Sequence, residues 1–322
     1  MDKIDRRKFI KNAAITGGAV IGSSLISTGA EASSGQDPKK FNQNWAVMFD
    51  ATKCIGCRTC ELACHTANKM KESDVDFTDL RVLETKRRTD ESSNTVINRF
   101  YPYERDARMN NKPVHIKKQC MHCNVPACVS ACIVAALRKT DEGPVYYEEN
   151  ACIGCRYCMI ACPFEIPVYE FDKPLFPIVL KCTLCYDKNI KNKKRNDRVP
   201  EKLPACVEAC PQEAMIFGRR EDLLKIGHEK IRKNPEIYDK KIYGEHVLGG
   251  TAWLYLTPVP AEEVGLPVLP DNPAPQLSET IQHSVFKSIF PFAIPLILYG
   301  LLGALMWKNS RQRNSSDDGE EG

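Results

Sequence analysis

Two nearly identical stretches decide the fold of this chain: CIGCRYCMIAC at residues 152–162 and CIGCRTCELAC at residues 54–64. Both have the spacing C-x2-C-x2-C-x3-C. Three thiolates within seven residues can wrap one compact inorganic core, whereas a tetrahedral zinc is usually gripped by two well-separated C-x2-C pairs. The two stretches therefore favour four-iron clusters, and their duplication indicates an internal repeat of the fold.

The cysteines of the chain number 16 among 322 residues, and they fall into four groups of four. The second group has the spacing C-x2-C-x4-C-x3-C, and the fourth has C-x2-C-x20-C-x3-C. In chain order the groups are Cys54, Cys57, Cys60 and Cys64; Cys120, Cys123, Cys128 and Cys132; Cys152, Cys155, Cys158 and Cys162; and Cys182, Cys185, Cys206 and Cys210.

Zinc ribbons and a disulfide scaffold are the alternative uses of so many cysteines. A zinc ribbon holds its metal with two separate C-x2-C pairs, without the third and fourth cysteines that follow closely here. The spacing C-x2-C-x2-C also places the thiols too close together for clean disulfide pairing. Covalent haem needs C-x2-C-H, a string that does not occur. We interpret His65, His115 and His122 as bystanders rather than ligands.

The spacing also predicts how the groups combine. In bacterial two-cluster ferredoxins, such a run gives three ligands to one cluster and its fourth cysteine to the other. Groups two and three span only residues 120–162, so we expect them to interlock as one unit, and groups one and four to form a second unit around it. Apolar runs predict strands, and a charge-segregated run predicts a helix. The strands are expected at 46–50, 114–118, 144–149 and 214–217, and the helix at 221–233.

The predicted fold class is α+β: two interlocked ferredoxin-like two-cluster units, one inserted in the other, plus one C-terminal transmembrane helix. Residues 66–119 are interpreted as an insertion that covers one cluster. The predicted divisions are a signal peptide at 1–32, an outer unit at 45–115 and 171–235, an inserted unit at 116–170, an extended Pro-rich connector at 236–284, a transmembrane helix at 288–308 and a cytoplasmic tail at 309–322.

The N-terminus has the pattern of a twin-arginine export signal. Arg6 and Arg7 are followed by Phe9, by a weakly apolar stretch at 13–26 and by the small-residue ending at 30–32. Export after folding would let metal occupy the thiols before they reach an oxidising compartment.

The C-terminal stretch at 289–307 contains 19 residues without a charge. As a helix it would rise about 28 Å, close to the roughly 30 Å of a hydrocarbon core. Lys308, Arg311 and Arg313 follow it, which by the positive-inside rule predicts a cytoplasmic C-terminus. The predicted location is thus the periplasmic face of the cytoplasmic membrane, with a single C-terminal anchor.

The overall composition limits the remaining functions. A formal net charge of +4, with scattered basic residues, does not indicate nucleic-acid binding, and 27% charged residues exclude a wholly membrane-embedded chain. The sequence shows no nucleophile-base pair, phosphate loop or open metal site. We therefore expect a non-catalytic conductor of single electrons.

Four longer motifs carry a family resemblance: QCMHCNVPACVSAC at 119–132, CIGCRYCMIACPFEIP at 152–167, KCTLC at 181–185 and PACVEACP at 204–211. With them the chain resembles the iron-sulfur subunit of type 2 uptake hydrogenases. That subunit belongs to a superfamily of four-cluster electron-transfer subunits, which includes the beta subunits of formate dehydrogenase, dimethyl sulfoxide reductase and nitrate reductase. One departure is Ile133, where many relatives have proline.

The resemblance implies four [4Fe-4S] clusters, each held by one set of four cysteines. Set A is Cys54, Cys57, Cys60 and Cys210; set B is Cys64, Cys182, Cys185 and Cys206; set C is Cys120, Cys123, Cys128 and Cys162; set D is Cys132, Cys152, Cys155 and Cys158.

It also implies two partners, a hydrogenase-type catalytic heterodimer that supplies electrons and an integral membrane subunit that reduces quinone. Two alternatives stay open. One is the equivalent subunit of a formate dehydrogenase or another transmembrane redox complex. The other is a structural membrane anchor stapled by zinc or disulfides.

Overall fold

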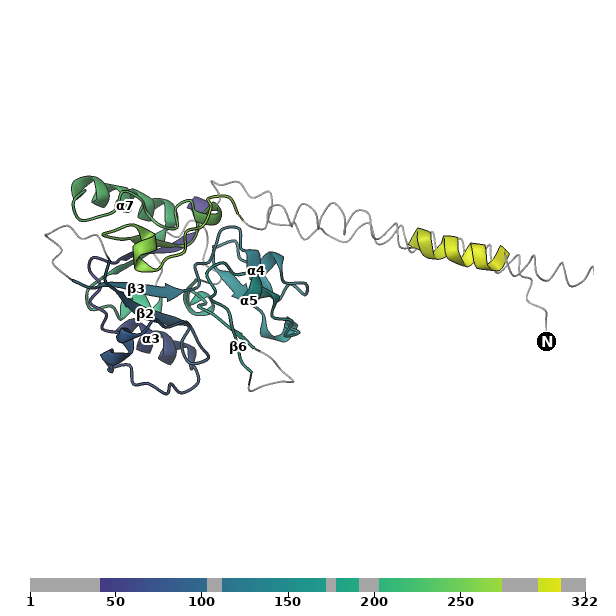
Figure 1. Ribbon diagram of the computed structural model, residues 1–322, viewed down its shortest axis with the longest axis horizontal. Coiled ribbons are helices and arrows are strands. Elements are labelled where there is room, and N and C mark those ends of the chain that lie inside the picture. Colours follow the sequence, from purple (N-terminus) through teal and green to yellow (C-terminus); the bar gives the residue numbers. More distant parts are fainter. Residues whose placement is uncertain (1–40, 103–111, 172–177, 191–202, 274–294, 308–322) are drawn as a thin grey trace, which may run out of the picture. The chain divides into compact units, whose positions relative to one another are not determined.

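The computed structural model describes residues 41–102, 112–171, 178–190, 203–273 and 295–307 (Figure 1). The chain divides into two units, Met1–Gly35 and Gln36–Gly322, and all described residues belong to the second. The signal peptide at 1–32 and the tail at 309–322 lie outside the described residues, so both stay predictions.

Short strands and helices alternate along the described chain. The strands are β1 (Trp45–Asp50), β2 (Thr95–Phe100), β3 (Val114–Gln119), β4 (Leu137–Lys139), β5 (Val145–Tyr147), β6 (Val168–Tyr169), β7 (Val179–Leu180), β8 (Met215–Arg219) and β9 (Trp253–Leu256). The α-helices are α3 (Thr59–Asn68), α4 (Ala127–Ser130), α5 (Tyr157–Ala161), α6 (Ala205–Glu208) and α7 (Arg220–Lys233). The single-turn elements are η3 (Leu80–Glu84), η4 (Glu149–Ala151), η5 (Tyr186–Ile190), η6 (Val247–Gly249) and η7 (Ala261–Val264).

A three-stranded sheet in the order β8-β1-β9 forms the centre of the protein. Strand β1 pairs antiparallel with β8 and parallel with β9, and all six of its residues are buried. A strand covered on both faces reads as a continuous apolar run rather than as an alternating one. WAVMFD has this character, which is why the sequence predicts it as a strand.

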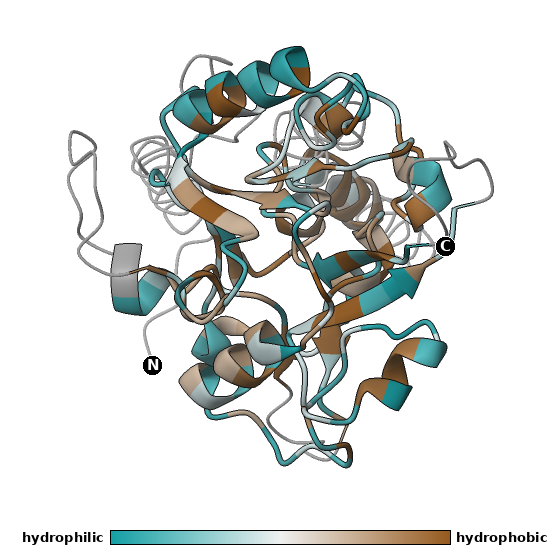
Figure 2. Cartoon of the chain, turned by 90° about the vertical axis from the view of Figure 1, so that its left-hand side faces the viewer, coloured by the Kyte–Doolittle hydropathy of each residue, from teal (hydrophilic) through white to brown (hydrophobic). Residues whose placement is uncertain are grey.

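The two faces of this sheet pack against different layers. Because side chains alternate along a strand, Ala46 and Met48 point to one face, where they pack with Leu223 of α7. Gly227 lets the helix approach, since a Cβ there would lie 2.6 Å from the Met48 Cε. Figure 2 shows hydrophobic and hydrophilic residues alternating along α7 at the top of the view, as expected for a helix with one covered face. On the opposite face, Val47 and Phe49 join the core that contains cysteines of groups one, two and four.

Three two-stranded hairpins surround the cysteines. Strands β2 and β3 pair antiparallel from Thr95↔Gln119 to Phe100↔Val114, and β2 contacts α3. The pairs β4-β5 and β6-β7 border a separate core, which contains Cys128 and Cys158. The strands predicted ahead of groups one, two and three and after group four are confirmed as β1, β3, β5 and β8. After Cys132, Cys162 and Cys210 the chain forms non-helical turns, whereas after Cys64 it continues as helix α3.

The segment predicted as an extended connector, 236–284, differs from that prediction within its described part, 236–273. Strand β9 lies in it and is completely buried beside β1. The prolines that suggested a connector begin at Pro258, just after this strand. The apolar run WLYL therefore belongs to the core, while the proline-rich chain follows it.

The predicted transmembrane helix at 288–308 is wrong. The part of this segment that the structure describes, 295–307, is helical. Within the described ranges, the structure has no helix with the length and apolar character that a membrane crossing requires. The predicted localisation depended on this single C-terminal anchor and is wrong for the same reason.

Candidate metal centres

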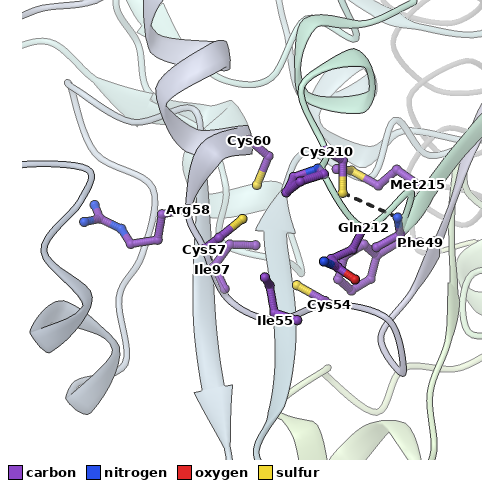
Figure 3. A pocket seen from close by; sticks show the side chains of 12 residues that line it. Phe49, Cys54, Ile55, Cys57, Arg58, Cys60, Ile97, Cys210, Gln212 and Met215 are labelled. Carbon is purple, nitrogen blue, oxygen red and sulfur yellow. Dashed lines mark hydrogen bonds between the residues drawn. The ribbon is translucent and has the colours of Figure 1, made fainter.

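Four thiols from two distant parts of the chain line one cavity next to β1 (Figure 3). Cys54 and Cys57 lie in the loop after β1, Cys60 lies in the first turn of α3, and Cys210 follows α6. Phe49 and Met215 of the central sheet complete the wall. Helices α3 and α6 pack together, which brings the fourth cysteine of group four to the loop of group one. These are the four members of set A.

Electrostatic interactions between thiols show which other cysteines are neighbours. Cys64 interacts with Cys185 and Cys206, and Cys182 interacts with Cys64 and Cys206. These four cysteines are the members of set B. All four are buried, so no thiol of this set reaches the surface.

The remaining eight cysteines gather around α4 and α5, which pack against each other. In set C, Cys123 and Cys128 both interact electrostatically with Cys120 and Cys162. In set D, Cys158 interacts with the other three members, Cys132, Cys152 and Cys155. The structure thus brings together the members of each set, and whether each set ligates a cluster stays a prediction.

The backbone at the start of each group repeats one conformation. In the first C-x2-C pair of every group, the residue just before the second cysteine has a positive φ, the left-handed region that most residues avoid. These residues are Gly56 (75°), His122 (48°), Gly154 (71°) and Leu184 (52°). The turn directs an N–H toward the first cysteine: the N–H of Gly154 donates to the Cys152 Sγ at 3.4 Å, and that of Leu184 to the Cys182 Sγ at 3.4 Å.

A second repeated turn follows the fourth cysteine of three groups. The third residue after this cysteine again has a positive φ, at Ala135 (52°), Glu165 (54°) and Glu213 (46°). The next N–H then points back at sulfur, as Ala136 N donates to the Cys132 Sγ at 3.2 Å and Ala214 N donates to the Cys210 Sγ at 3.4 Å. Such hydrogen bonds stabilise thiolate charge and tune the potential of a ligated cluster.

Burial controls the protonation of the free thiols. Loss of hydration raises the pKa of Cys54 to about 11, that of Cys64 to about 12 and that of Cys158 to about 11. The pKa values of Cys60 and Cys182 also rise well above the ordinary value, mainly through burial. Metals bind the thiolate form of cysteine, so metal binding at these sites releases protons. The positive charge of the metal then stabilises thiolates that burial alone disfavours.

The donor chemistry of the four sets fits iron-sulfur clusters, which are held by four cysteine thiolates. All 16 cysteines are free thiols. Among the residues that the structure describes, no three Cys, His, Asp or Glu side chains are grouped closely enough to hold a single metal ion. A bound [4Fe-4S] cluster would supply reversible one-electron transfer, while the chain supplies thiolates, N–H donors and burial.

Comparisons with known proteins agree with this donor set. Residues 112–220 match the family described as 4Fe-4S dicluster domain, and residues 45–66 match a 4Fe-4S binding domain. The chain is 33% identical over 344 residues to the hydrogenase-2 operon protein HybA of Escherichia coli O157:H7, covering 98% of both chains. The chain belongs to the family of ferredoxin-type iron-sulfur subunits.

Two further relatives show the breadth of this family. The formate dehydrogenase-O iron-sulfur subunit of Escherichia coli K12 is 31% identical over 247 residues, 76% of each chain. A protein of Nitratidesulfovibrio vulgaris is 43% identical over 265 residues, 82% of this chain and 67% of the relative. The resemblance stated from the motifs is confirmed, and this iron-sulfur subunit is an electron-transfer protein that carries multiple [4Fe-4S] clusters.

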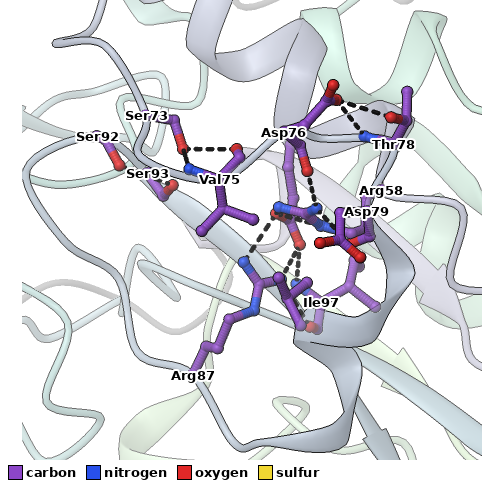
Figure 4. Close-up of polar contacts among 12 residues, drawn as sticks. Arg58, Ser73, Val75, Asp76, Thr78, Asp79, Arg87, Ser92, Ser93 and Ile97 are labelled. Atoms are coloured by element: carbon purple, nitrogen blue, oxygen red, sulfur yellow. Dashed lines mark hydrogen bonds and ion pairs between the residues drawn. The ribbon is translucent and has the colours of Figure 1, made fainter.

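The first loop of the iron-sulfur subunit is braced by a buried ion network (Figure 4). Arg58 has a left-handed backbone and is almost fully buried, and its side chain forms an ion pair with Glu61 at 3.0 Å. Its Nη1 donates to the backbone oxygens of Asp76 (2.7 Å) and Asp79 (2.9 Å). Glu61 also pairs with Arg87 and accepts the N–H of Ile97 at 2.6 Å. Residues of the 66–119 insertion therefore lock the loop of group one in place.

The three histidines interpreted as bystanders contact backbone groups. His65 Nε2 lies 2.8 Å from the Lys71 oxygen, and His115 Nδ1 lies 3.2 Å from the Cys54 oxygen. His122 is completely buried, its Nδ1 accepts the Val145 N–H at 2.9 Å, and burial lowers its pKa well below the usual range. His122 is thus a neutral side chain packed between C-x2-C cysteines.

Two buried lysines and one partly buried lysine beside the thiols were not predicted from the sequence. Lys117 lies in β3, Lys139 ends β4, and Lys181 directly precedes Cys182. Lys181 Nζ donates to the backbone oxygens of Val145 and Cys182, and Lys139 Nζ to those of His122 and Cys123. One signal was present in VHIKK, because strand alternation must point one of two adjacent lysines inward. A lysine in a short strand otherwise indicates a solvent-facing position.

Proposed function

We propose that this iron-sulfur subunit relays single electrons along four [4Fe-4S] clusters, one in each set of cysteines. The observation that carries the proposal is the gathering of 16 thiols from four distant segments into four sets of four. On this proposal the chain conducts electrons for a catalytic partner and performs no catalytic step itself.

Neighbour relations between the sets support a linear order A-B-C-D. Sets A and B share helices α3 and α6, and Cys60 of set A interacts electrostatically with Cys206 of set B. Cys182 of set B interacts with Cys120 of set C. Sets C and D share α4 and α5, because each helix region provides cysteines to both sets. An electron therefore meets the sets one after another.

The two ends of this order are the most open to solvent. Cys155 of set D is the one exposed cysteine of the 16, and Ile160 in the following helix α5 is 82% exposed. At the other end, set A has three partly accessible cysteines, and Ile55 is 56% exposed. Set B has no accessible cysteine, and set C has two partly accessible ones, Cys123 and Cys162. The greater accessibility of sets A and D supports electron entry at one end of the order and exit at the other.

We propose a hydrogenase-type catalytic heterodimer and an integral membrane quinone-interacting subunit as the two partners. The name of the relative aligned over 98% of both chains refers to a hydrogenase-2 operon, which supports this choice. The formate dehydrogenase-O subunit aligns over 76% of each chain and supports the equivalent role in a formate dehydrogenase as the alternative. Identifying the catalytic subunit that co-purifies with the tagged full chain separates the two.

The relay is tested by metal content and paramagnetic resonance on the anaerobically purified chain. Four clusters require about 16 iron atoms per chain and four one-electron signals on reduction. Zinc without iron, or a colourless sample that stays silent after reduction, would refute the proposal.

The two open ends are tested by matched substitutions, Ile55→Glu and Ile160→Glu. Each places a charge on an exposed apolar side chain, so we expect iron content to be unchanged while a different partner is lost in each variant. Loss of the same partner from both variants, or of neither, would contradict a relay with one partner at each end.

A further inference from the structure

Lys117 carries a buried charge that no carboxylate neutralises. The residue is 1% exposed, and its Nζ donates to the Thr95 Oγ1 at 2.7 Å and to the Gln119 Oε1 at 3.2 Å. The Nζ also lies 4.5 Å from the centroid of the Trp253 ring. All three partners are neutral, and within the described residues Lys117 forms no ion pair with an acid.

A buried lysine without an anion is strongly unfavourable, because an ammonium loses its hydration on burial. Desolvation alone would lower the pKa of Lys117, yet the pKa is raised, because the nearby cysteines Cys60, Cys64, Cys182 and Cys206 favour the charged form. Thiolates that ligate metal at these cysteines would therefore supply the negative charge that Lys117 lacks.

These four cysteines do not belong to one set. Cys60 is a member of set A, whereas Cys64, Cys182 and Cys206 are members of set B. Lys117 consequently lies close to both sets, because the Trp253 ring against which its Nζ lies belongs to the same core as Cys60, Cys182 and Cys206. The neighbouring side chains hold it there, since Gln119 also donates to Tyr255 at 2.6 Å and the Tyr255 hydroxyl donates to the Lys117 backbone oxygen at 2.8 Å.

We propose that Lys117 sets the reduction potentials of both clusters in sets A and B, through one positive charge that the two clusters share. The inference rests on the proposed ligation of clusters by these sets. Reducing a cluster adds one electron and hence one negative charge, and a fixed cation in a low-dielectric interior stabilises that charge. Lys117 thereby raises the potentials of the first two clusters of the relay together.

The geometry supplies an internal control in Lys139. Its Nζ donates to the His122 and Cys123 oxygens, and it interacts electrostatically with Cys120, Cys123 and Cys128, all members of set C. Removing the charge of Lys117 and removing that of Lys139 should therefore shift the potentials of different clusters. A general loss of stability would not produce this difference between the two variants.

The experiment is a redox titration of the anaerobic full chain, followed by paramagnetic resonance, for the wild type, Lys117→Gln, Lys117→Arg and Lys139→Gln. Signals are first assigned with Cys210→Ser for set A and Cys185→Ser for set B. In Lys117→Gln we expect the reduction equilibria of both A and B to shift at least tenfold toward the oxidised form, which is 59 mV for a one-electron couple. Lys117→Arg keeps the charge and should restore both potentials, and Lys139→Gln should shift set C alone.

Equal shifts in Lys117→Gln and Lys117→Arg would indicate a purely structural role and would overturn the proposal. So would unchanged A and B potentials in Lys117→Gln. If Lys117→Gln does not assemble, Gln119→Glu provides the same test, because an isosteric carboxylate 3.2 Å from the Nζ offsets its charge. We expect Gln119→Glu to lower the same two potentials, and unmoved potentials in this variant reject the proposal. A wild-type chain without four signals would reject the relay instead, so the two failures are distinguishable.

Discussion

The two copies of the cysteine loop, residues 54–64 and 152–162, have the same backbone but different surroundings. Arg58 and Arg156 occupy equivalent positions with φ values of 63° and 64°. Arg58 is buried and paired with Glu61, whereas Arg156 is exposed and stacks on the rings of Tyr169 and Phe171. The two copies therefore share the backbone geometry that positions the thiols. The segments that pack around each copy differ, and they determine how far the loop is exposed to solvent.

The difference continues one turn later. Glu61 in the first copy is fully buried and ties α3 to β2, whereas its counterpart Met159 is partly buried and packs against the smaller core. Leu62 is 44% exposed, and the equivalent Ile160 is 82% exposed. The first copy is thus built into the body of the protein, and the second stays near its surface.

The largest expected effect comes from substituting the one cysteine of set A or set D that lies outside the loop. Cys210→Ser should damage the cluster at the first loop, and Cys132→Ser the cluster at the second, because each serine removes a thiolate that comes from another segment. We expect each variant to lose a different signal in paramagnetic resonance after anaerobic reduction. Loss of the same signal in both variants would contradict the predicted sets.

Breaking the ion network of the first copy should have the next largest effect. Glu61→Gln leaves Arg58 buried without its anion, and removing one member of a buried ion pair costs about 3 kcal/mol or more. The matched change Met159→Leu in the second copy should cost less than about 1.5 kcal/mol, since it conserves volume and apolar character. Thermal unfolding midpoints of the two variants give the comparison, and equal midpoints would show that the network does not brace the loop.

A smaller effect is expected at the glycine of the first copy. A Cβ on Gly56 would lie 2.5 Å from the His115 Cδ2, and the φ of 75° adds strain, so Gly56→Ala should destabilise the protein by about 2 kcal/mol. Equivalent positions hold His122 and Leu184, so the backbone alone accepts a side chain. Adding His115→Ala should therefore restore part of the loss in denaturant unfolding. If His115→Ala restores no stability, the destabilisation by Gly56→Ala comes from backbone strain and not from the contact with His115.

The smallest effects are expected where the two copies meet solvent. Ile160→Ser should change the free energy of unfolding by less than about 0.5 kcal/mol, and Leu62→Ser by somewhat more, because more of the leucine is covered. Denaturant titration of the purified variants measures both. A larger loss for Ile160→Ser would mean that its side chain is buried in solution.

The sequence predicted those parts of the fold in which neighbouring residues carry the information. WAVMFD is apolar at every position but its last, and the helix expected at 221–233 is observed as α7, Arg220–Lys233. The grouping of the cysteines into sets came from a family resemblance, since spacing alone indicates that loops share ligands but not which loops meet. Their electrostatic neighbours in the structure depend on α3 packing against α6 and α4 against α5.

The remaining features depend on contacts between distant residues. Strand β9 was overlooked because prolines follow it closely, although its pairing with β1 is what buries it. Lys117 carries no local signal that distinguishes it from Lys118, and only the core around Trp253 shows which lysine points inward.

The order of strands in the central sheet has a consequence for biosynthesis. Strand β1 emerges early from the ribosome, but its two partners, β8 and β9, are translated only after all four cysteine groups. Cys54, Cys57 and Cys60 of set A are therefore synthesised long before Cys210, the fourth member of the set. Because contacts between such distant segments form late in folding, we expect the four thiols of set A to come together only when translation is nearly complete.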